Sequence, residues 1–214
     1  MASVKPTRKY ESPHRREQMA QTRTKILEAA RRLFEAQGYS ATTMNAVAAE
    51  AGVALKTVYV AFESKAGLLR ALWHVLLRGD ERPEAVGQRA WYREVLDEPD
   101  PARQLALNAR NSRIVKERAA ELMHVLASAA ASDADAADLW ERIQVEFHDN
   151  QQAIVRSLQR KRALKPGLGV KRATDILWTL NHPQVFRLLV KDRGWTPAQY
   201  EAWFREAARS QLLA

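Results

Sequence analysis

The segment TTMNAVAAEAGVALKTVYVAFESK, residues 42–65, predicts two short helices separated by one glycine. Apolar residues recur at three- and four-residue spacing before the glycine, which is typical of one buried helix face. Thr43 has a suitable N-cap side chain at the start of the first helix. Gly52 can adopt a positive φ, so the chain can turn sharply into the second helix. The pattern therefore predicts a helix-turn-helix, although an ordinary helical hairpin has the same spacing.

The second helix is expected to turn Val53 and Val58 inward and to present a mixed polar and apolar face to the outside. An exposed cation, hydroxyl, phenol and small apolar groups suit the major groove, where bases offer acceptors, donors and the thymine methyl group. The residues expected on this outward face are Leu55, Lys56, Thr57, Tyr59, Val60 and Ala61.

Both flanks of this segment carry further helical patterns. Residues 24–37 alternate apolar and charged positions with helical period, and Gly38 stands where such a helix would end. Ser64 can cap a following helix whose buried stripe is formed by leucines. These are Leu68, Leu69, Leu72 and Leu76. The hairpin is therefore expected in the middle of a compact helical unit.

Over roughly residues 22 to 75 the chain resembles the tetracycline-repressor (TetR) family of transcription regulators. The resemblance rests on Ala29-Ala30, Leu33-Phe34, Gly38-Tyr39, Thr42-Thr43, the segment AAEAGV at 48–53, Thr57-Val58-Tyr59, the segment FESK at 62–65, and Leu68-Leu69. Two departures, Ala54 in place of a frequent serine cap and Val60-Ala61 in place of a more polar pair, bear on the operator sequence and leave the fold unaffected.

The resemblance implies an all-α fold, with an N-terminal three-helix helix-turn-helix DNA-binding domain and a C-terminal helical bundle for ligand binding and dimerisation. By chemistry, the candidate base-reading residues are Asn45, Lys56, Val60 and Ala61. By the resemblance, the candidate phosphate contacts are Thr43, Thr57, Tyr59 and Lys65. The partner expected for these residues is double-stranded DNA.

The composition agrees with a nucleic-acid-binding protein. The chain has 214 residues, a formal net charge of +9 and a pI near 10.0, which favours phosphate or anionic-membrane surfaces without selecting between them. A protein that coats DNA without sequence preference would have the same charge balance. With no long apolar run, no signal peptide and no cysteine, we expect a cytoplasmic protein without a membrane partner, a disulfide or a thiolate metal site.

The pattern divides the chain into four parts: residues 1–21, 22–78, 79–101 and 102–214. The first is expected to be a flexible basic arm because Pro6 and Pro13 interrupt any helix; such an arm could contact DNA or remain a solvated tail. The second is the DNA-binding domain. The third is a junction containing a short helical patch around Trp91 and Tyr92, and the fourth is the ligand-binding and dimerisation domain.

The last two helices, expected over residues 170–192 and 196–213 with a kink at His182-Pro183, carry more large apolar groups than one hairpin would bury. A second copy of the chain would cover them, as the resemblance also implies, although they could instead complete the core of one chain. The candidate interface residues are Trp178, Val185, Phe186, Leu189, Tyr200, Trp203 and Phe204. A homodimer of this kind would bind a palindromic operator.

In the resembled family an effector usually binds among the middle helices of the C-terminal domain. The candidate pocket residues here are Met123, His124, Trp140, Phe147, His148 and Trp178. Aromatic and methionine walls suit a small apolar or aromatic effector, although the helical spacing of each single residue favours a place in the core. The resulting hypothesis is a repressor that such an effector releases from DNA.

Catalysis is a weaker alternative. His148-Asp149 lies about one helical turn from Glu141 and Glu146, which is conceivable for a metal or acid–base site. Charged residues on a long helix usually form its solvated face, and the sequence has no His-x-x-x-His pair, phosphate loop or nucleophile elbow. We therefore expect no enzyme activity, no cofactor and no metal.

Overall fold

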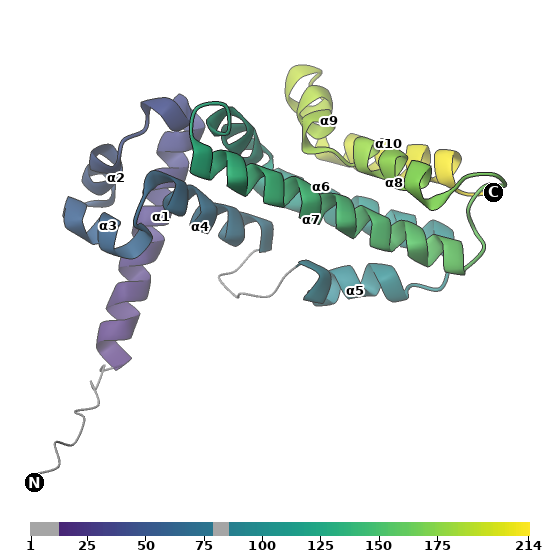
Figure 1. Cartoon of the computed structure of the whole chain (residues 1–214), viewed down its shortest axis with the longest axis horizontal. Coiled ribbons are helices and arrows are strands. Elements are labelled where there is room, and N and C mark those ends of the chain that lie inside the picture. The colour runs from purple at the N-terminus through teal and green to yellow at the C-terminus, as the bar shows by residue number, and fades with distance from the viewer. Residues whose placement is uncertain (1–12, 79–85) are drawn as a thin grey trace, which may run out of the picture.

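The computed structural model describes residues 13–78 and 86–214, and the regular elements in these ranges are helices (Figure 1). In chain order they are α1 (Pro13–Ala41), α2 (Met44–Ala51), α3 (Leu55–Phe62), α4 (Lys65–Arg78), η1 (Val86–Gln88), α5 (Ala90–Asp97), α6 (Pro101–Ala129), α7 (Ala134–Arg160), α8 (Val170–Leu180), α9 (Pro183–Arg187), η2 (Leu188–Asp192) and α10 (Pro197–Leu212). The chain is therefore all-α, as its sequence predicts. No helix in the described ranges is both long and apolar enough to cross a membrane.

The helix-turn-helix forms as its local sequence predicts. Thr43 caps α2, because its hydroxyl oxygen accepts the Ala46 N–H at 3.1 Å. Gly52 ends α2 with φ 66° and ψ 36°, a left-handed conformation that costs glycine little. The next helix, α3, starts at Leu55 after Ala54, which makes no side-chain cap hydrogen bond. Ser64 accepts the Gly67 N–H at 3.0 Å and so caps α4.

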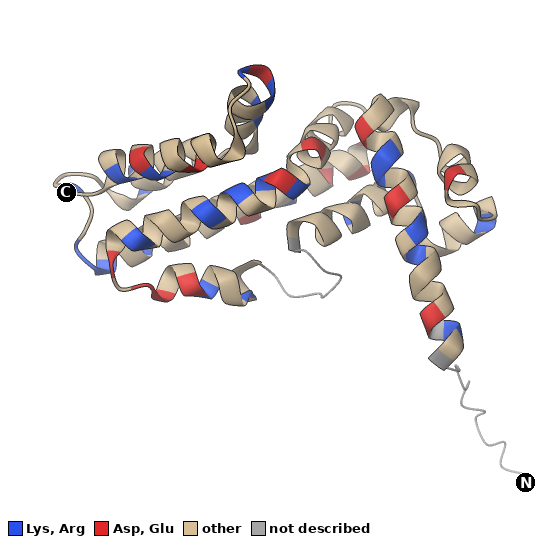
Figure 2. Cartoon of the chain, turned by 180° about the vertical axis from the view of Figure 1, so that it is seen from behind, with Lys and Arg blue, Asp and Glu red and all other residues tan. Residues whose placement is uncertain are grey.

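The first helix is longer than its sequence suggests. We expected a flexible arm up to residue 21, but α1 begins at Pro13, so this expectation is wrong for residues 13–21. Proline is tolerated at the first helical position because the N–H that it lacks would have no partner there. Residues 1–12, which hold the other residues of the expected arm, lie outside the described part of the chain. Acidic and basic side chains alternate along α1 (Figure 2).

The C-terminal half is built on α6 and α7, which run side by side over most of its length (Figure 1). The short helix α5 lies on one side of this pair, and α8, α9 and α10 lie on the other. Helix α6 continues without a break through Asn111 and Ser112, whose side chains bond to other elements. Asn111 Nδ2 donates to the Trp91 carbonyl at 3.0 Å, and Ser112 bonds to Asn181. His182 and Pro183 separate α8 from α9, which confirms the expected kink.

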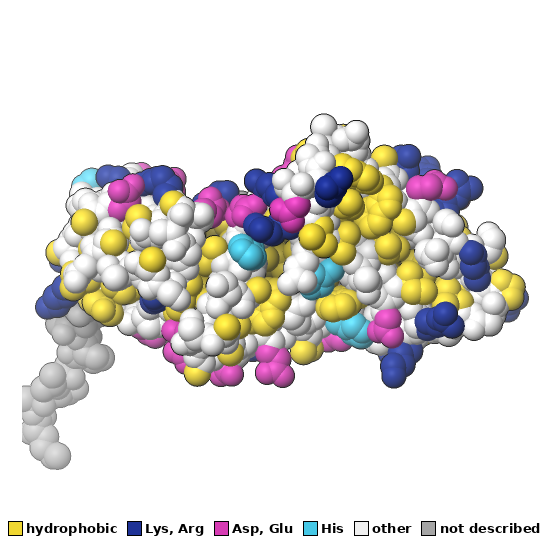
Figure 3. Space-filling view, turned by 90° about the horizontal axis from the view of Figure 1, so that it is seen from above, with side chains coloured by type: hydrophobic (Ala, Val, Ile, Leu, Met, Phe, Trp, Pro, Cys, Tyr) yellow, Lys and Arg dark blue, Asp and Glu magenta, His cyan; other side chains and the backbone are white. Residues whose placement is uncertain are grey.

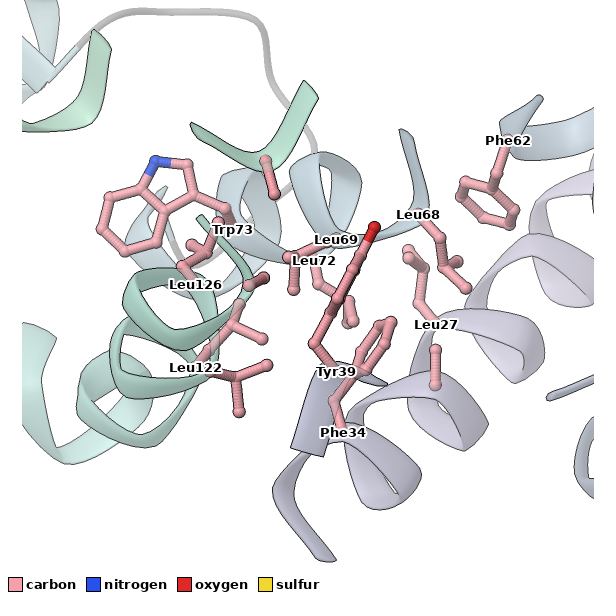
Figure 4. Close-up of a cluster of buried hydrophobic side chains, with 14 of the residues drawn as sticks. Leu27, Phe34, Tyr39, Phe62, Leu68, Leu69, Leu72, Trp73, Leu122 and Leu126 are labelled. Carbon is pink, nitrogen blue, oxygen red and sulfur yellow. The ribbon is translucent and has the colours of Figure 1, made fainter. Parts of the chain in front are cut away.

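One apolar cluster joins the DNA-binding helices to the C-terminal half. It combines buried residues of α1–α4 with residues of α6 and α7. Leu122 and Leu126 of α6 pack against the side of α4 that carries Leu72 and Trp73 (Figure 4). A second cluster holds α5 to α10 together. The position of α4 is therefore determined by both halves of the molecule.

A close approach at the start of α4 leads to a testable prediction. A Cβ atom added at Gly67 would lie 2.1 Å from the Phe62 carbonyl oxygen, which belongs to the last residue of α3. Alanine normally favours a helix, but here we expect Gly67→Ala to lower the free energy of unfolding by about 1–3 kcal/mol, because backbone must move. Urea unfolding followed by circular dichroism measures this change.

Gly87→Ala is the matched control, because a Cβ at Gly87 has no atom within 4 Å. An unchanged unfolding free energy for Gly67→Ala, equal to that of the control, would contradict the claim that the Phe62 carbonyl at the end of α3 leaves no room for a Cβ at Gly67.

Candidate nucleic-acid interface and ligand cavity

The exposed face of α3 carries the side chains expected to contact DNA. Val60 is 74% exposed and Tyr59 46%, while Lys56 is also exposed. Val58 and Phe62 on the opposite face are buried, so the helix has a clear inner and outer side. Asn45 on α2 is exposed as well. The structure thus brings an amide, an ammonium, a phenol and an aliphatic group to one end of the molecule, a combination suited to groove contacts.

Two residues expected at the DNA surface also have contacts within the chain. Ala61 is half-buried and packs against the core, and its carbonyl accepts a hydrogen bond from Arg23 Nη1 at 3.0 Å. The Lys65 ammonium donates to the carbonyls of Tyr39 at 2.9 Å and Thr42 at 3.1 Å. Ala61 therefore helps attach α3, Lys65 satisfies carbonyls at the end of α1, and the DNA contacts expected of both stay predictions. Thr43 is exposed and Thr57 half-buried, and their phosphate contacts stay predictions.

Arg23 has a role that the sequence pattern did not reveal. Its guanidinium lies 4.4 Å from the centre of the Phe62 ring and donates to the last turn of α3. The distance and geometry are those of a cation–π contact. Because Arg23 belongs to α1, these contacts hold the end of the exposed helix against α1.

A polar contact connects the DNA-binding helices to α7. Tyr39 donates its phenol proton to the Asp133 carboxylate at 2.7 Å, and Asp133 also caps α7 through the Ala136 N–H. Burial and this hydrogen bond raise the pKa of Tyr39 well above its usual value, so the phenol stays protonated. The bond from Tyr39, followed by backbone hydrogen bonds, lowers the pKa of Asp133.

An internal cavity of about 100 Å³ lies between α4, α5, α6, α7 and the start of α9. Its walls are mainly aromatic and aliphatic, with Trp73 from α4, Trp91 from α5 and Phe147 from α7. Of the six residues expected to bind a ligand, Met123 and Phe147 line it. The small volume falls below the 300 Å³ or more of a typical ligand pocket, so a larger ligand would have to move a wall.

The other expected pocket residues lie elsewhere. His124 and Trp140 border a separate cavity of about 20 Å³. His148 is partly exposed and lies 3.6 Å from the Asp175 carboxylate, and Trp178 packs against His182 with 4.8 Å between ring centres. These four residues are therefore outside the main cavity.

One wall of the main cavity is polar, which the sequence analysis missed. Ser112 and Lys116, one turn apart on α6, bond to Asn181, and Asn181 Nδ2 donates to Gln151 Oε1 at 3.1 Å. All four residues are buried. Burial lowers the pKa of Lys116 to about 7. The signal available in the sequence was a row of polar residues at four-residue spacing on one helix, Gln104, Asn108, Ser112 and Lys116.

The expected dimer residues separate into two groups. Phe186, Tyr200 and Phe204 are buried within one chain, with Tyr200 stacked near Phe204 at 6.0 Å between ring centres. These three were wrongly assigned to an interface, because helical periodicity does not show whether a buried face packs within its own chain or against a second copy. The partly exposed members are Trp178, Val185, Leu189 and Trp203. A hydrophobic area is visible on this side of the molecule, over the part that contains α8–α10 (Figure 3).

The residues considered for a catalytic site are dispersed. Glu141 and Asp149 are exposed on α7, Glu146 borders the main cavity, and His148 is engaged with Asp175. Within residues 13–78 and 86–214, no group of three or more His, Asp or Glu side chains is placed to hold a metal ion.

Comparison with known proteins agrees with this geometry. Residues 26–72 match the family described as "Bacterial regulatory proteins, tetR family". Over 164 residues, 74% of this chain and 75% of the relative, the sequence is 30% identical to the "Probable HTH-type transcriptional regulator ArpR" of Pseudomonas putida. The chain belongs to the TetR family. It is accordingly a DNA-binding transcriptional regulator and not an enzyme.

Solved structures share the fold of this TetR-family chain at lower identity. A SmeT–triclosan complex has a TM-score of 0.72 at 18% identity, covering 91% of this chain and 92% of that one. A regulator from Saccharomonospora viridis in complex with choline has a TM-score of 0.71 at 14% identity, covering 91% and 99%. NalD of Pseudomonas aeruginosa has a TM-score of 0.68 at 21% identity, covering 92% and 98%. These similarities establish the fold.

The contact between Tyr39 and Asp133 predicts an acid-sensitive contribution to stability. Tyr39→Phe should lower the free energy of unfolding by about 1–3 kcal/mol near pH 7, since a hydrogen bond to a charged group is lost. The Asp133 pKa is lowered in the folded state, so this stabilisation is present above the unfolded value near 3.9 and declines as pH falls through the folded value. Urea unfolding at pH 7 and below pH 4 measures both effects.

Tyr92→Phe provides the matched control, because Tyr92 donates at 2.6 Å to the uncharged Asn150 carbonyl. Its deficit should persist at acid pH. A Tyr39→Phe deficit that persisted in the same way would show that Asp133 ionisation contributes nothing to the contact.

Proposed function

We propose that this TetR-family regulator is a homodimeric repressor that binds a palindromic operator and is released by a small molecule bound in the main cavity. The observation that carries the DNA-binding part is the exposed face of α3. Lys56, Tyr59 and Val60 point outward from a helix whose inner face is buried and whose end is attached to α1 by Arg23. A rigid helix with such a face is suited to read base edges in the major groove.

Dimerisation is supported by the apolar surface of α8–α10. Leu188 is 56% exposed, and several further apolar residues of these elements are only partly covered by the second core cluster. They include Ile176, Leu180, Val185, Leu189, Val190 and Trp203. A twofold interface here would leave α3 of each chain exposed. Two copies of α3 that lie about 34–36 Å apart, or a multiple of this distance, would match palindromic half-sites.

Effector release is supported by the position of the cavity. Trp73 and Leu77 on its wall belong to α4, which also packs against α1 and α3. A ligand that enlarges the cavity would shift α4 and with it the exposed helix. A hundredfold loss of DNA affinity needs only about 2.7 kcal/mol of preference for the released form. The structural relatives with triclosan and choline show that chains of this fold hold small molecules, and NalD is described as a repressor.

Binding-site selection from a random duplex library, run with purified protein at two salt concentrations, tests the proposed DNA specificity. We expect a palindrome with half-sites about 10 bp or more apart, bound far more tightly than scrambled DNA at the higher salt. A pool that stays random, with binding that disappears as salt rises, would support non-specific coating of DNA instead.

Replacement of Leu188 tests the dimer interface. We expect Leu188→Glu to shift the protein from dimer to monomer in sedimentation experiments and to weaken operator binding at least tenfold, because a carboxylate would be buried between two chains. Val145→Glu is the matched control, since Val145 is also 56% exposed but lies on α7. If both variants sediment like the original protein, Leu188 is not in the interface.

A further inference from the structure

The main cavity contains a buried amine. Lys116 is only 5% exposed, and its ammonium group bonds to Ser112 Oγ and Asn181 Oδ1. It also lies 5.5 Å from the centre of the Tyr200 ring. Asn181 is held in this orientation because its amide nitrogen donates to Gln151. Lys116 is therefore held by Ser112 on its own helix and by Asn181 at the end of α8, and it lies beside Tyr200 of α10.

This amine has no acidic partner among the described residues. No salt bridge to Lys116 is formed, and burial alone accounts for its lowered pKa, with no contribution from a carboxylate. A charged lysine has three N–H donors, and two of them are used by Ser112 and Asn181. A buried charge without a counter-ion is costly, so an anion reaching Lys116 would gain both a partner charge and a hydrogen bond.

The groups around Lys116 favour one negative charge on a ring-shaped ligand. The cavity walls include Trp91, Tyr92 and Phe147, and the volume of about 100 Å³ is of the same order as the roughly 150 Å³ of a cavity that accommodates benzene. Glu146 also lines the cavity, but it borders a depression on the outer surface as well, so it lies toward solvent. Its carboxylate would oppose a second negative charge.

We propose that the effector of this protein is a single-ring aromatic monoanion, such as a carboxylate, whose acid group pairs with Lys116. The ring occupies the space between Trp91 and Phe147, and the acid group completes the hydrogen bonding of the ammonium. This assignment deepens the proposed effector release and rests on it for its biological role. The chemistry of the site is separately measurable.

Binding of such an anion is linked to protonation. At pH 8 Lys116 is largely neutral in the free protein, because its pKa is about 7, and a bound anion raises that pKa. The other titratable groups around it are Glu146, His182, Tyr92 and Tyr200. The pKa of His182 is lowered by burial and by the charge of Lys116. The raised pKa values of Tyr92 and Tyr200 keep both phenols neutral. Binding should therefore take up more protons at pH 8 than at pH 6.

Calorimetric titration with benzoate, benzamide and benzylamine tests the assignment. Benzoate and benzamide have the same ring and nearly the same shape, and differ in charge. We expect the original protein to bind benzoate at least tenfold more tightly than benzamide, and benzylamine most weakly. Lys116→Met should lose this preference at least tenfold while it still binds benzamide. Titrations at pH 8 in two buffers of different ionisation enthalpy report the proton uptake, which Lys116→Met should abolish.

Several results would overturn the assignment. These are equal affinity for benzoate and benzamide, benzoate preference retained in Lys116→Met, or no benzoate binding at millimolar concentration. Operator affinity is measured on the same samples, with and without benzoate. If benzoate binds through Lys116 but leaves operator affinity unchanged, the anion site is correct and the proposed release by an effector fails.

Discussion

The packing of α4 against α6 is the constraint on which the rest of the molecule depends. Leu69, Leu72 and Trp73 are almost fully buried, and they lie in one cluster with residues of α1–α3 and of α6. The two helices of the reading motif have eight residues each, too few to be stable alone. Their position therefore comes from this shared core.

Polar contacts at the edge of the core add orientation to this packing. Lys65 satisfies carbonyls at the end of α1, Arg23 attaches the end of α3, and Tyr39 connects α1 to the cap of α7. Each contact joins two elements through one directional bond, whereas apolar packing by itself tolerates sliding. These hydrogen bonds explain how the exposed helix α3 can keep one orientation toward DNA although α2 and α3 are short.

The cavity combines two features that each lower the stability of a folded protein, a buried amine and incomplete packing. It lies where α4 meets the C-terminal half, and buried polar groups around Lys116 form one of its walls. Burial of an amine without a carboxylate costs stability, and a cavity in a core costs packing energy. Both costs fall when a ligand fills the cavity, which agrees with the proposed effector release.

Local sequence determined the parts of this protein that depend on neighbours along the chain. The caps at Thr43 and Ser64, the turn at Gly52 and the kink before Pro183 follow from local preferences of single residues and were predictable. The inward position of Val58 also predicted an outward face of α3, on which Lys56, Tyr59 and Val60 are exposed as expected.

Only the tertiary structure decided what each apolar or polar face meets. Periodicity shows that Phe204 and Trp203 lie on buried or half-buried positions, but not that the first is covered by its own chain and the second is left partly open. It gave no reason to place Lys116 beside Asn181, 65 residues away along the chain, or to leave no room for a Cβ at Gly67. Such contacts depend on the relative position of distant helices, which is set by the complementary shapes of whole packed surfaces and not by the spacing of residues within one helix.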